Sequence, residues 1–203
     1  LSQDPREELK AYVGTYLKEE IQQEGWVRRF PAFSRFLLTA ALSSGEMVNF
    51  ANVGSDAQVA PATVREYYQI LEDTLLGYSL EPWTKSKKRK AIQTAKFYLF
   101  DNGVYHQLLG TKTDQIERNS DLYGKSFEHL MAMELRAWLS YRRQDEPLCY
   151  WRTDTRHEVD FLIGDEIAIE LKASSKTTSR DIKNLVALQD EKKFRKYLIV
   201  SQD

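Results

Sequence analysis

Two carboxylates and one amine stand close together near the end of the chain, at spacings that could support phosphodiester chemistry. Asp160 lies in one run of alternating apolar and polar residues, and Glu170 and Lys172 belong to the next run. Carboxylate oxygens are preferred ligands of Mg²⁺, and a neighbouring ammonium group can hold a phosphate or orient an attacking water. The residue types therefore indicate a divalent-cation site, with a solvated face of cross-strand charge pairs as the alternative.

Strict alternation of apolar residues places these three side chains on one face of a β-hairpin. Such a period of two predicts half-buried strands, and matching of the apolar faces fixes their register. A loop at residues 164–166 then pairs Ile163 with Ile167. The same register puts Asp160 directly opposite Glu170, with Lys172 one pleat further along. Two opposed carboxylates repel each other, which favours a bound cation over a solvated face. The alternating apolar positions are Val159, Phe161, Ile163, Ile167, Ile169 and Leu171.

The composition is that of an ordinary soluble globular protein. The chain has 203 residues, of which 42% are hydrophobic and 29% charged, and its net charge is -1. A nucleic-acid surface must therefore be a local basic patch. The single cysteine, Cys149, excludes an internal disulfide framework and fits a reducing, cytoplasmic location. No apolar run approaches transmembrane length and no signal peptide is recognisable, so we expect no membrane partner.

The first half of the chain predicts a helical domain that ends in a winged helix. A short helix or turn, followed by a helix that opens with Pro61, has the order of a helix-turn-helix. Two strands around a basic loop follow it and complete the wing. The expected helices are 4–23, stopped by Gly25; 34–43, after a connection at Phe30-Pro31; 49–55; 61–76, stopped by Gly77; and 101–109, and the expected strands are 78–83 and 95–100.

From Thr84 to Lys96, in the loop of this wing and the start of the strand after it, there are six cations and no acid. Most charge runs are solvated, but a wing tip can contact nucleic-acid phosphates. The exposed start of the 61–76 helix offers no clear pair of base-reading side chains. Many winged helices contact proteins, so a protein-binding role stays open. The residues expected to bind nucleic acid are Thr63, Arg65, Lys85, Lys87, Lys88, Arg89 and Lys90.

The second half predicts the order helix, strand, strand, strand, helix, strand. We expect the boundary in the polar segment 111–121, which gives domains of residues 1–110 and 111–203. Glu128 lies in the first turns of the long helix of this second domain. The expected elements are a helix at 122–143, a strand at 148–152, the hairpin at 158–172, a helix at 180–192 and a buried, parallel final strand at 197–200.

This order, with Asp160 on one strand and Glu170-Leu171-Lys172 on the next, resembles the PD-(D/E)xK nuclease superfamily. Phe127-Glu128 matches the acid often found on the preceding helix of that superfamily, and Val159 stands in place of its Pro. The resemblance implies an α+β chain, with a winged-helix domain followed by a restriction-endonuclease-like, three-layer αβββαβ domain. It also implies Mg²⁺ or Mn²⁺ held by Asp160 and Glu170 with help from Glu128, and Lys172 as the residue that orients the nucleophile or offsets charge.

Nearly the whole chain is also similar to the C-terminal part of a prokaryotic family of AAA-type ATPases that carry a C-terminal domain of unknown function. The matching segments include 16–21, 63–67, 71–77, 96–103, 124–128, 150–153 and 158–161. The resemblance implies an N-terminal ATPase domain outside this sequence, which starts at Leu1 without Met and is expected to be a fragment. ATP is expected only in that domain.

Two functions are therefore expected of this chain. The first is Mg²⁺-dependent hydrolysis of DNA phosphodiester bonds by an endonuclease. The second is a non-catalytic module with a degenerate nuclease fold, which binds DNA or the ATPase domain. DNA and the protein's own ATPase domain are the expected partners, and both a homo-oligomer and a role as regulatory adaptor are left open.

Overall fold

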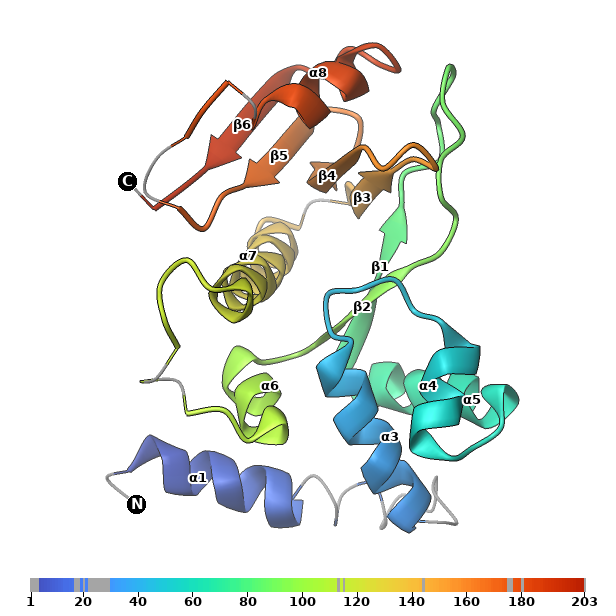
Figure 1. The fold of residues 1–203 in the computed structure, drawn as a ribbon, viewed down its shortest axis with the longest axis vertical. Helices are drawn as coiled ribbons and strands as arrows, with labels where there is room; N and C mark the ends of the chain where they lie inside the picture. Colours follow the sequence, from blue (N-terminus) through green and yellow to red (C-terminus); the bar gives the residue numbers. More distant parts are fainter. Residues whose placement is uncertain are drawn as a thin grey trace. The chain divides into compact units, whose positions relative to one another are not determined.

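The structure is a computed structural model that describes residues 4–16, 19, 21, 30–112, 114, 116–143, 145–174, 177–179 and 181–202. Its helices and strands are labelled in Figure 1. The chain divides into two compact units: Leu1–Tyr78 with Phe97–Ile116, and Ser79–Lys96 with Glu117–Asp203. The stretch 79–96 thus belongs to the second unit, whereas the sequence predicted one continuous domain up to residue 110. The mixture of helices and strands confirms the predicted α+β class.

The first unit opens with helix α1 (Pro5–Ala11), which begins as predicted. The Asp4 side chain accepts a hydrogen bond from the Arg6 N–H at 2.9 Å, and Pro5 occupies the first turn, where it has no intrahelical N–H bond to lose. A π-helical turn (Tyr12–Tyr16) continues the helix. The predicted extension to residue 23 lies largely outside the described residues, as does the predicted stop at Gly25.

Among the described residues, helices α3 (Phe30–Leu42), α4 (Phe50–Ala57) and α5 (Pro61–Asp73) follow before the first strand. The predicted connection at Phe30-Pro31 was wrong, because these residues form the first turn of α3, where proline is tolerated. Asn49 caps α4 by accepting the N–H groups of Ala51 and Asn52. The order α4, turn, α5 is the predicted helix-turn-helix order.

Helix α5 ends at Asp73, and Gly77 begins strand β1 (Gly77–Pro82), so the predicted helix stop at Gly77 was wrong. The reason for glycine is a close approach to strand β2 (Lys96–Leu99). A Cβ at position 77 would lie 2.2 Å from Cζ of Phe97 and 2.9 Å from the carbonyl oxygen of Tyr98. Phe97 is only 2% exposed and has no room to move away. After β2, the Asp101 carboxylate caps α6 (Asn102–Leu109) through the Val104 N–H.

Gly77→Ala is expected to destabilise the first unit by about 1–3 kcal/mol, because the new methyl group overpacks a buried ring. Gly124→Ala is the matched control. A Cβ at Gly124, in helix α7 (Asp121–Tyr141), meets nothing within 4 Å. Alanine there is expected to gain up to about 1 kcal/mol of helix propensity. Thermal unfolding of both variants checks the prediction, which is contradicted if the two substitutions shift the melting temperature equally.

A mixed sheet forms the second unit, with neighbouring strands in the order β1-β3-β4-β5-β6. β1 pairs with β3 and β5 with β6 in parallel, whereas β3, β4 and β5 are antiparallel. Helices α7 and α8 (Lys183–Gln189) lie to either side of strands β4 to β6 (Figure 1). The order α7, β3, β4, β5, α8, β6 is the predicted one. The remaining bounds are β3 (Leu148–Arg152), β4 (Glu158–Ile163), β5 (Ile167–Leu171) and β6 (Lys196–Val200).

The predicted register of the β4–β5 hairpin is confirmed where the strands pair. Ile163 lies opposite Ile167, and Phe161 lies opposite Ile169. Backbone pairing of the two strands ends at Phe161 and Ile169. One residue further on, Oδ2 of Asp160 accepts the Leu171 N–H at 2.7 Å. The Asp160 side chain therefore accepts a backbone hydrogen bond from β5 at the position where the sequence predicted Asp160 and Glu170 directly opposite each other.

Both faces of this hairpin are covered, so the prediction of half-buried strands was wrong. Leu162 and Ala168 lie on the same face of the hairpin as Asp160 and Glu170, yet both are fully buried, in a core shared with α8. Strand β6, in contrast, is more exposed than predicted. Leu198 is 41% exposed, and β6 alternates between exposed and half-buried residues, so the predicted buried strand is an edge strand. The core consists of Trp83, Cys149, Trp151, Val159, Leu162, Ala168, Leu185, Ala187, Leu188 and Phe194.

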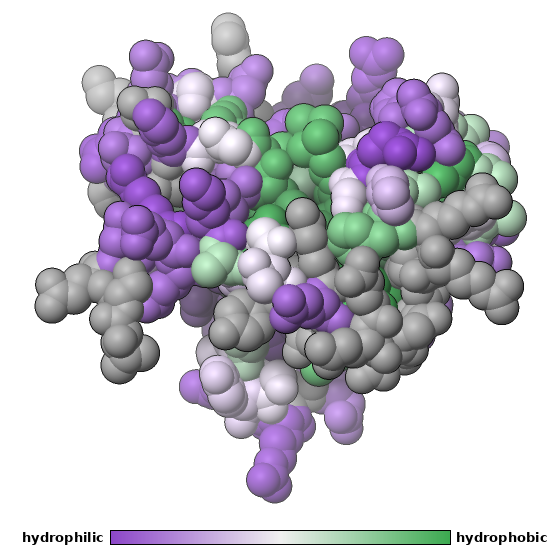
Figure 2. All heavy atoms as spheres, turned by 90° about the horizontal axis from the view of Figure 1, so that it is seen from below, coloured by the Kyte–Doolittle hydropathy of each residue, from purple (hydrophilic) through white to green (hydrophobic). Residues whose placement is uncertain are grey.

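Apolar side chains also reach the surface. Figure 2 shows hydrophobic side chains that reach the surface among hydrophilic ones. The exposed large apolar side chains come from both units, and the homo-oligomer stays a prediction. None of the described helices has the length and hydrophobicity that a bilayer crossing demands. The exposed set is Leu38, Leu42, Leu75, Leu130, Trp138, Tyr141, Ile182, Val186 and Leu198.

Candidate functional site

Glu170 presents the strongest sign of a site in the second unit. The residue is 3% exposed, and its Oε2 is buried with no hydrogen-bond partner in the described structure. Its Oε1 accepts from Nζ of Lys172 at 2.9 Å and from Nδ2 of Asn184 at 3.4 Å. A buried carboxylate oxygen without a donor is energetically costly and needs a reason. A bound cation would supply one.

Asp160 carries the second sign. The pKa of Asp160 is raised to about 8, by burial first and then by the charges of Glu128 and Glu170, although the Leu171 N–H and the charge of Lys96 act in the opposite direction. Burial also raises the pKa of Glu170, against the hydrogen bond from Lys172. Like charges packed in this way are unfavourable unless a cation neutralises them. Pairs of perturbed carboxyl groups of this kind are typical of functional sites.

Lys172 is placed to act as a donor and not as a base. Its side chain is 28% exposed, and its Nζ also lies 4.0 Å from Asp181. Burial lowers the pKa of Lys172, but the hydrogen bond to Glu170 and the surrounding negative charges outweigh that effect and raise it. The amine therefore stays protonated at neutral pH and can donate hydrogen bonds to an anion or a water.

The sequence analysis missed a buried ion-pair network beside this pair. Nζ of Lys96 lies 3.0 Å from Oε1 of Glu128 and 2.7 Å from Oε1 of Glu158. The Lys96 side chain is 4% exposed, and its Nζ is 5.2 Å from the centroid of the Tyr150 ring. Burial lowers the pKa of Lys96, yet the two carboxylates raise it well above its usual range. A lysine within an otherwise apolar strand was the available signal, because lysine is rarely buried without a partner.

Asn184 is a second residue that the sequence did not single out. It projects from α8 and links two parts of the site. Its Nδ2 donates to Glu170, and its Oδ1 lies 3.4 Å from Nδ1 of His157. An amide that donates to a carboxylate has its oxygen left for a donor, so this geometry favours the His157 tautomer with a proton on Nδ1. No spacing pattern in the sequence connects these residues.

The described residues fit a divalent cation through two carboxylates. No three His, Cys, Asp or Glu side chains within the described part of the chain are grouped closely enough to hold a metal ion together. Mg²⁺ is often held by one or two carboxylates, with water and substrate phosphate completing its shell. Asp160 and the partnerless oxygen of Glu170 meet that requirement. Glu128, the third predicted ligand, is paired with Lys96.

The predicted wing loop lies in the second unit. Hydrogen bonds and ion pairs hold it to acidic residues that are distant in sequence. The buried Glu191 carboxylate accepts hydrogen bonds from the backbone N–H groups of Lys87 and Lys88, at 2.7 Å and 2.6 Å. It also accepts one from Nη1 of the Arg89 side chain at 2.9 Å. Lys85 forms an ion pair with Asp165 at 2.9 Å. Two of the predicted phosphate-binding cations therefore already have carboxylate partners.

The other predicted nucleic-acid residues are distributed over both units. Lys87, Lys88 and Lys90 are exposed side chains of the loop in the second unit. Thr63 and Arg65 lie near the start of α5 in the first unit, where the Arg65 guanidinium stacks 4.9 Å from the centroid of the Phe50 ring.

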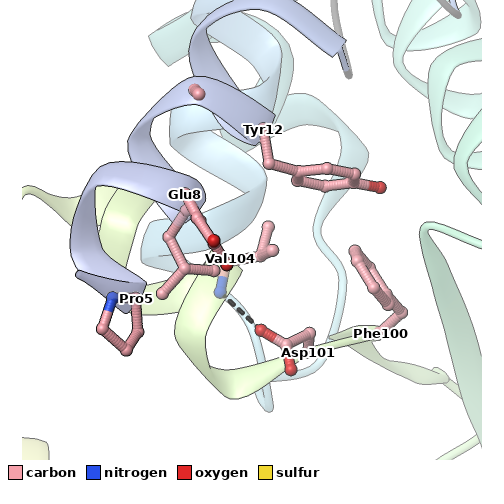
Figure 3. Close-up of a pocket in the computed structure, with 8 residues that line it drawn as sticks. Pro5, Glu8, Tyr12, Phe100, Asp101 and Val104 are labelled. Carbon is pink, nitrogen blue, oxygen red and sulfur yellow. Dashed lines mark hydrogen bonds between the residues drawn. The ribbon is translucent and has the colours of Figure 1, made fainter. Parts of the chain in front are cut away.

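The first unit contains a separate hollow of about 560 Å³ between α1 and α6 (Figure 3). Its walls are mainly apolar, and the rings of Tyr12 and Phe100 lie 6.1 Å apart beside it. The Asp101 carboxylate points to the Val104 N–H that it caps, at 2.7 Å. This carboxylate therefore serves as the N-cap of α6.

The fold and the acidic pair define an α+β protein with a candidate cation site on a central hairpin. Residues 1–115 match a domain of unknown function (DUF8612), and the chain belongs to this family. Residues 123–203 match a second domain of unknown function (DUF4143). Residues 116–122 lie between the two matched segments.

Two curated relatives are similar over most of this chain. They are the uncharacterized proteins Mb2031c of Mycobacterium bovis and Rv2008c of Mycobacterium tuberculosis, each 32% identical over 186 residues. The alignment covers 88% of this chain and 41% of each relative. The chain thus spans about two fifths of the length of these relatives. No solved structure matches the chain.

Proposed function

We propose that the second unit hydrolyses DNA phosphodiester bonds with Mg²⁺ or Mn²⁺. The observation that carries the proposal is the buried oxygen of Glu170 without a partner, beside Asp160, whose pKa is raised to about 8 by burial and by like charges. A divalent cation would neutralise these groups and satisfy that oxygen. The resemblance of the hairpin and the preceding helix to PD-(D/E)xK nucleases supports the same assignment.

Asp160 and Glu170 hold the cation in this proposal, and the N–H of Leu171 orients Asp160. When bound, a divalent cation supplies Lewis-acid charge to a phosphodiester oxygen and acidifies a coordinated water. Lys172 remains protonated, so it orients the attacking water or donates to the oxygens that gain negative charge. Asn184 and Lys172 together fix the rotamer of Glu170.

The first unit binds DNA in the same proposal, through the start of α5, and ATP belongs to a domain outside these residues. The greater length of both curated relatives is compatible with such a domain. The similarity of the whole chain to the C-terminal part of an AAA-type ATPase family supports this assignment. Nucleotide hydrolysis is accordingly assigned to no residue of this chain.

Cleavage of supercoiled plasmid tests the proposed reaction. We expect the 203-residue chain to nick plasmid in Mg²⁺ or Mn²⁺ but not in EDTA, and Asp160→Asn to lower the rate by at least about 100-fold. Glu166→Gln is the matched control, because it removes an exposed acid from the turn of the same hairpin. Equal rates for the wild type and Asp160→Asn would overturn the assignment.

A non-catalytic module is the second candidate, and the pairing of Glu128 with Lys96 favours it, because this pairing occupies the third acid that the resemblance to nucleases assigns to the metal. In that case the wild type binds DNA in the presence or absence of Mg²⁺ and does not cleave it. Gel-shift measurements run beside the plasmid assay separate the two functions. DNA binding without cleavage in either metal would establish the second candidate.

The exposed lysines of the basic loop are expected to contribute to DNA affinity. Lys87→Ala/Lys88→Ala/Lys90→Ala should weaken binding and lower the slope of log K against log salt by about 1–3, since each released phosphate contact contributes about 0.9. Lys85→Ala is the control, because its amine already pairs with Asp165. An unchanged slope in the triple variant would refute phosphate contact by this loop.

A further inference from the structure

We propose that Lys96 occupies the place of a second divalent cation, so that this site binds one metal ion, through Asp160 and Glu170. The proposal rests on the proposed function and specifies its ligand set. Nζ of Lys96 lies between Oε1 of Glu128 and Oε1 of Glu158, at 3.0 Å and 2.7 Å. Two carboxylates that converge on one cationic centre are the arrangement that a second metal would need.

The lysine is fixed in this place by more than its charge. It comes from strand β2, its side chain is 4% exposed, and the Tyr150 ring lies 5.2 Å from its Nζ. The Lys96 ammonium group is attached to the chain and already desolvated. It therefore fills this place without the loss of entropy that accompanies the binding of a free ion. A metal ion that entered between these two carboxylates would have to displace it and leave a buried ammonium group unpaired, which is strongly unfavourable.

The local charges leave room for one divalent cation. Four carboxyl groups, those of Glu128, Glu158, Asp160 and Glu170, share the site. Lys96 pairs with Glu128 and Glu158, and Arg152 also pairs with Glu158, at 2.6 Å. Lys172 pairs with one oxygen of Glu170 only. The uncompensated part of the site is therefore Asp160 with the other oxygen of Glu170, and it lacks a further acid within the described residues.

This arrangement differs from the ligand set that the sequence predicted, in which Glu128 assists the metal. Glu128 becomes a positioning residue: it holds the lysine and adds negative charge that raises the pKa of Asp160. Loss of Glu128 is thus expected to weaken cation binding without abolishing it. Loss of Lys96 is expected to open a new metal site between the carboxylates of Glu128 and Glu158.

Mn²⁺ titration of the complete chain, followed by the electron paramagnetic resonance of the free ion, tests the proposal through stoichiometry. The wild type is expected to bind one Mn²⁺, and Asp160→Asn and Glu170→Gln none. Glu128→Gln should retain one site, and Lys96→Met should bind two. Circular dichroism checks the fold of each variant. If Lys96→Met does not fold, Glu128→Gln still decides whether Glu128 is a ligand.

The outcomes separate this inference from the proposed function. Two Mn²⁺ ions on the wild type, or loss of the single site in Glu128→Gln, would overturn the role of Lys96 and leave a metal-dependent nuclease intact. A single site on folded Lys96→Met would also overturn it. Absence of any Mn²⁺ on the wild type would overturn the proposed function together with this inference.

Discussion

Replacing Asp160 by Asn is expected to stabilise the protein at pH 8 and to leave its stability nearly unchanged at pH 4. The pKa of Asp160 is raised from 3.8 to about 8, by burial first and then by the charges of Glu128 and Glu170. The folded state therefore holds a proton that the unfolded chain releases between these two values. Stability from this group is complete below pH 3.8 and is lost as the pH rises toward 8.

The size of this effect follows from the same linkage. One unit of pKa shift corresponds to about 1.4 kcal/mol, so the rise from 3.8 to about 8 corresponds to a loss on the order of 5–6 kcal/mol across the interval. Asparagine keeps an oxygen for the Leu171 N–H and carries no charge at any pH. Urea unfolding of both proteins at several pH values, without divalent cations, measures the difference. Equal pH dependence of the two proteins would contradict the buried, like-charged environment of Asp160.

Such a gain in stability on removal of a carboxylate is the expected signature of a functional site. Proteins keep unfavourable groups where activity needs them, and substitution there trades function for stability. The same substitution is expected to abolish cleavage and Mn²⁺ binding. Glu166→Gln, in the exposed turn of the same hairpin, should change neither stability nor cleavage appreciably.

Replacing Lys96 by Met is expected to destabilise the second unit by about 3–5 kcal/mol, because it leaves two carboxylates without their shared buried cation. The raised pKa of Lys96, which prevails over the effect of burial, shows that these carboxylates stabilise the charged amine in the folded state. Methionine is similar in length, so lost packing contributes little. Tryptophan fluorescence reports on the second unit, because Trp83, Trp138 and Trp151 lie there.

Lys85→Met provides the matched control for this loss. Lys85 also forms an ion pair, with Asp165, but its side chain is 66% exposed, so its removal should cost less than about 1 kcal/mol. Adding Glu158→Gln to Lys96→Met should recover part of the lost stability, since it removes one of the two negative charges that shared Lys96. Similar losses for Lys85→Met and Lys96→Met would show that burial does not distinguish the two pairs.

The hairpin was predictable because one physical rule determines it. The alternation of Val159, Phe161 and Ile163 fixes the face of β4, and a register slip would expose that face. The hydrogen bond from Leu171 to Asp160 was not predictable, because it replaces backbone pairing by a side chain where the ladder ends. The alternation also gave no indication that α8 covers the polar face.

Long-range partners account for most of what the sequence did not reveal. Lys96 was counted with the basic loop, although its carboxylate partners follow 32 and 62 positions later in Glu128 and Glu158. The anchors of the loop, Asp165 and Glu191, are 80 and 104 residues from Lys85 and Lys87. Local patterns report propensity and periodicity, and they carry no information about such pairs.

Single residues caused the remaining differences. Gly77 was interpreted as a helix stop, but it permits the approach of Phe97, which depends on strand pairing. Pro31 was interpreted as a connection, although a proline fits equally well in the first turn of a helix. Strand β6 is parallel to a neighbour as predicted, but the predicted burial was wrong, because β6 is the last strand of the sheet.

The most direct test of the central claim, that Asp160 and Glu170 are kept for a divalent cation, is the Mg²⁺ dependence of the melting temperature at pH 8. Binding to the folded state at 100 times the dissociation constant stabilises a protein by about 2.7 kcal/mol. The wild type is therefore expected to melt at a higher temperature in Mg²⁺ than in EDTA, and Asp160→Asn at the same temperature in both. A wild-type melting temperature that does not respond to Mg²⁺, or an equal response in Asp160→Asn, would contradict the account.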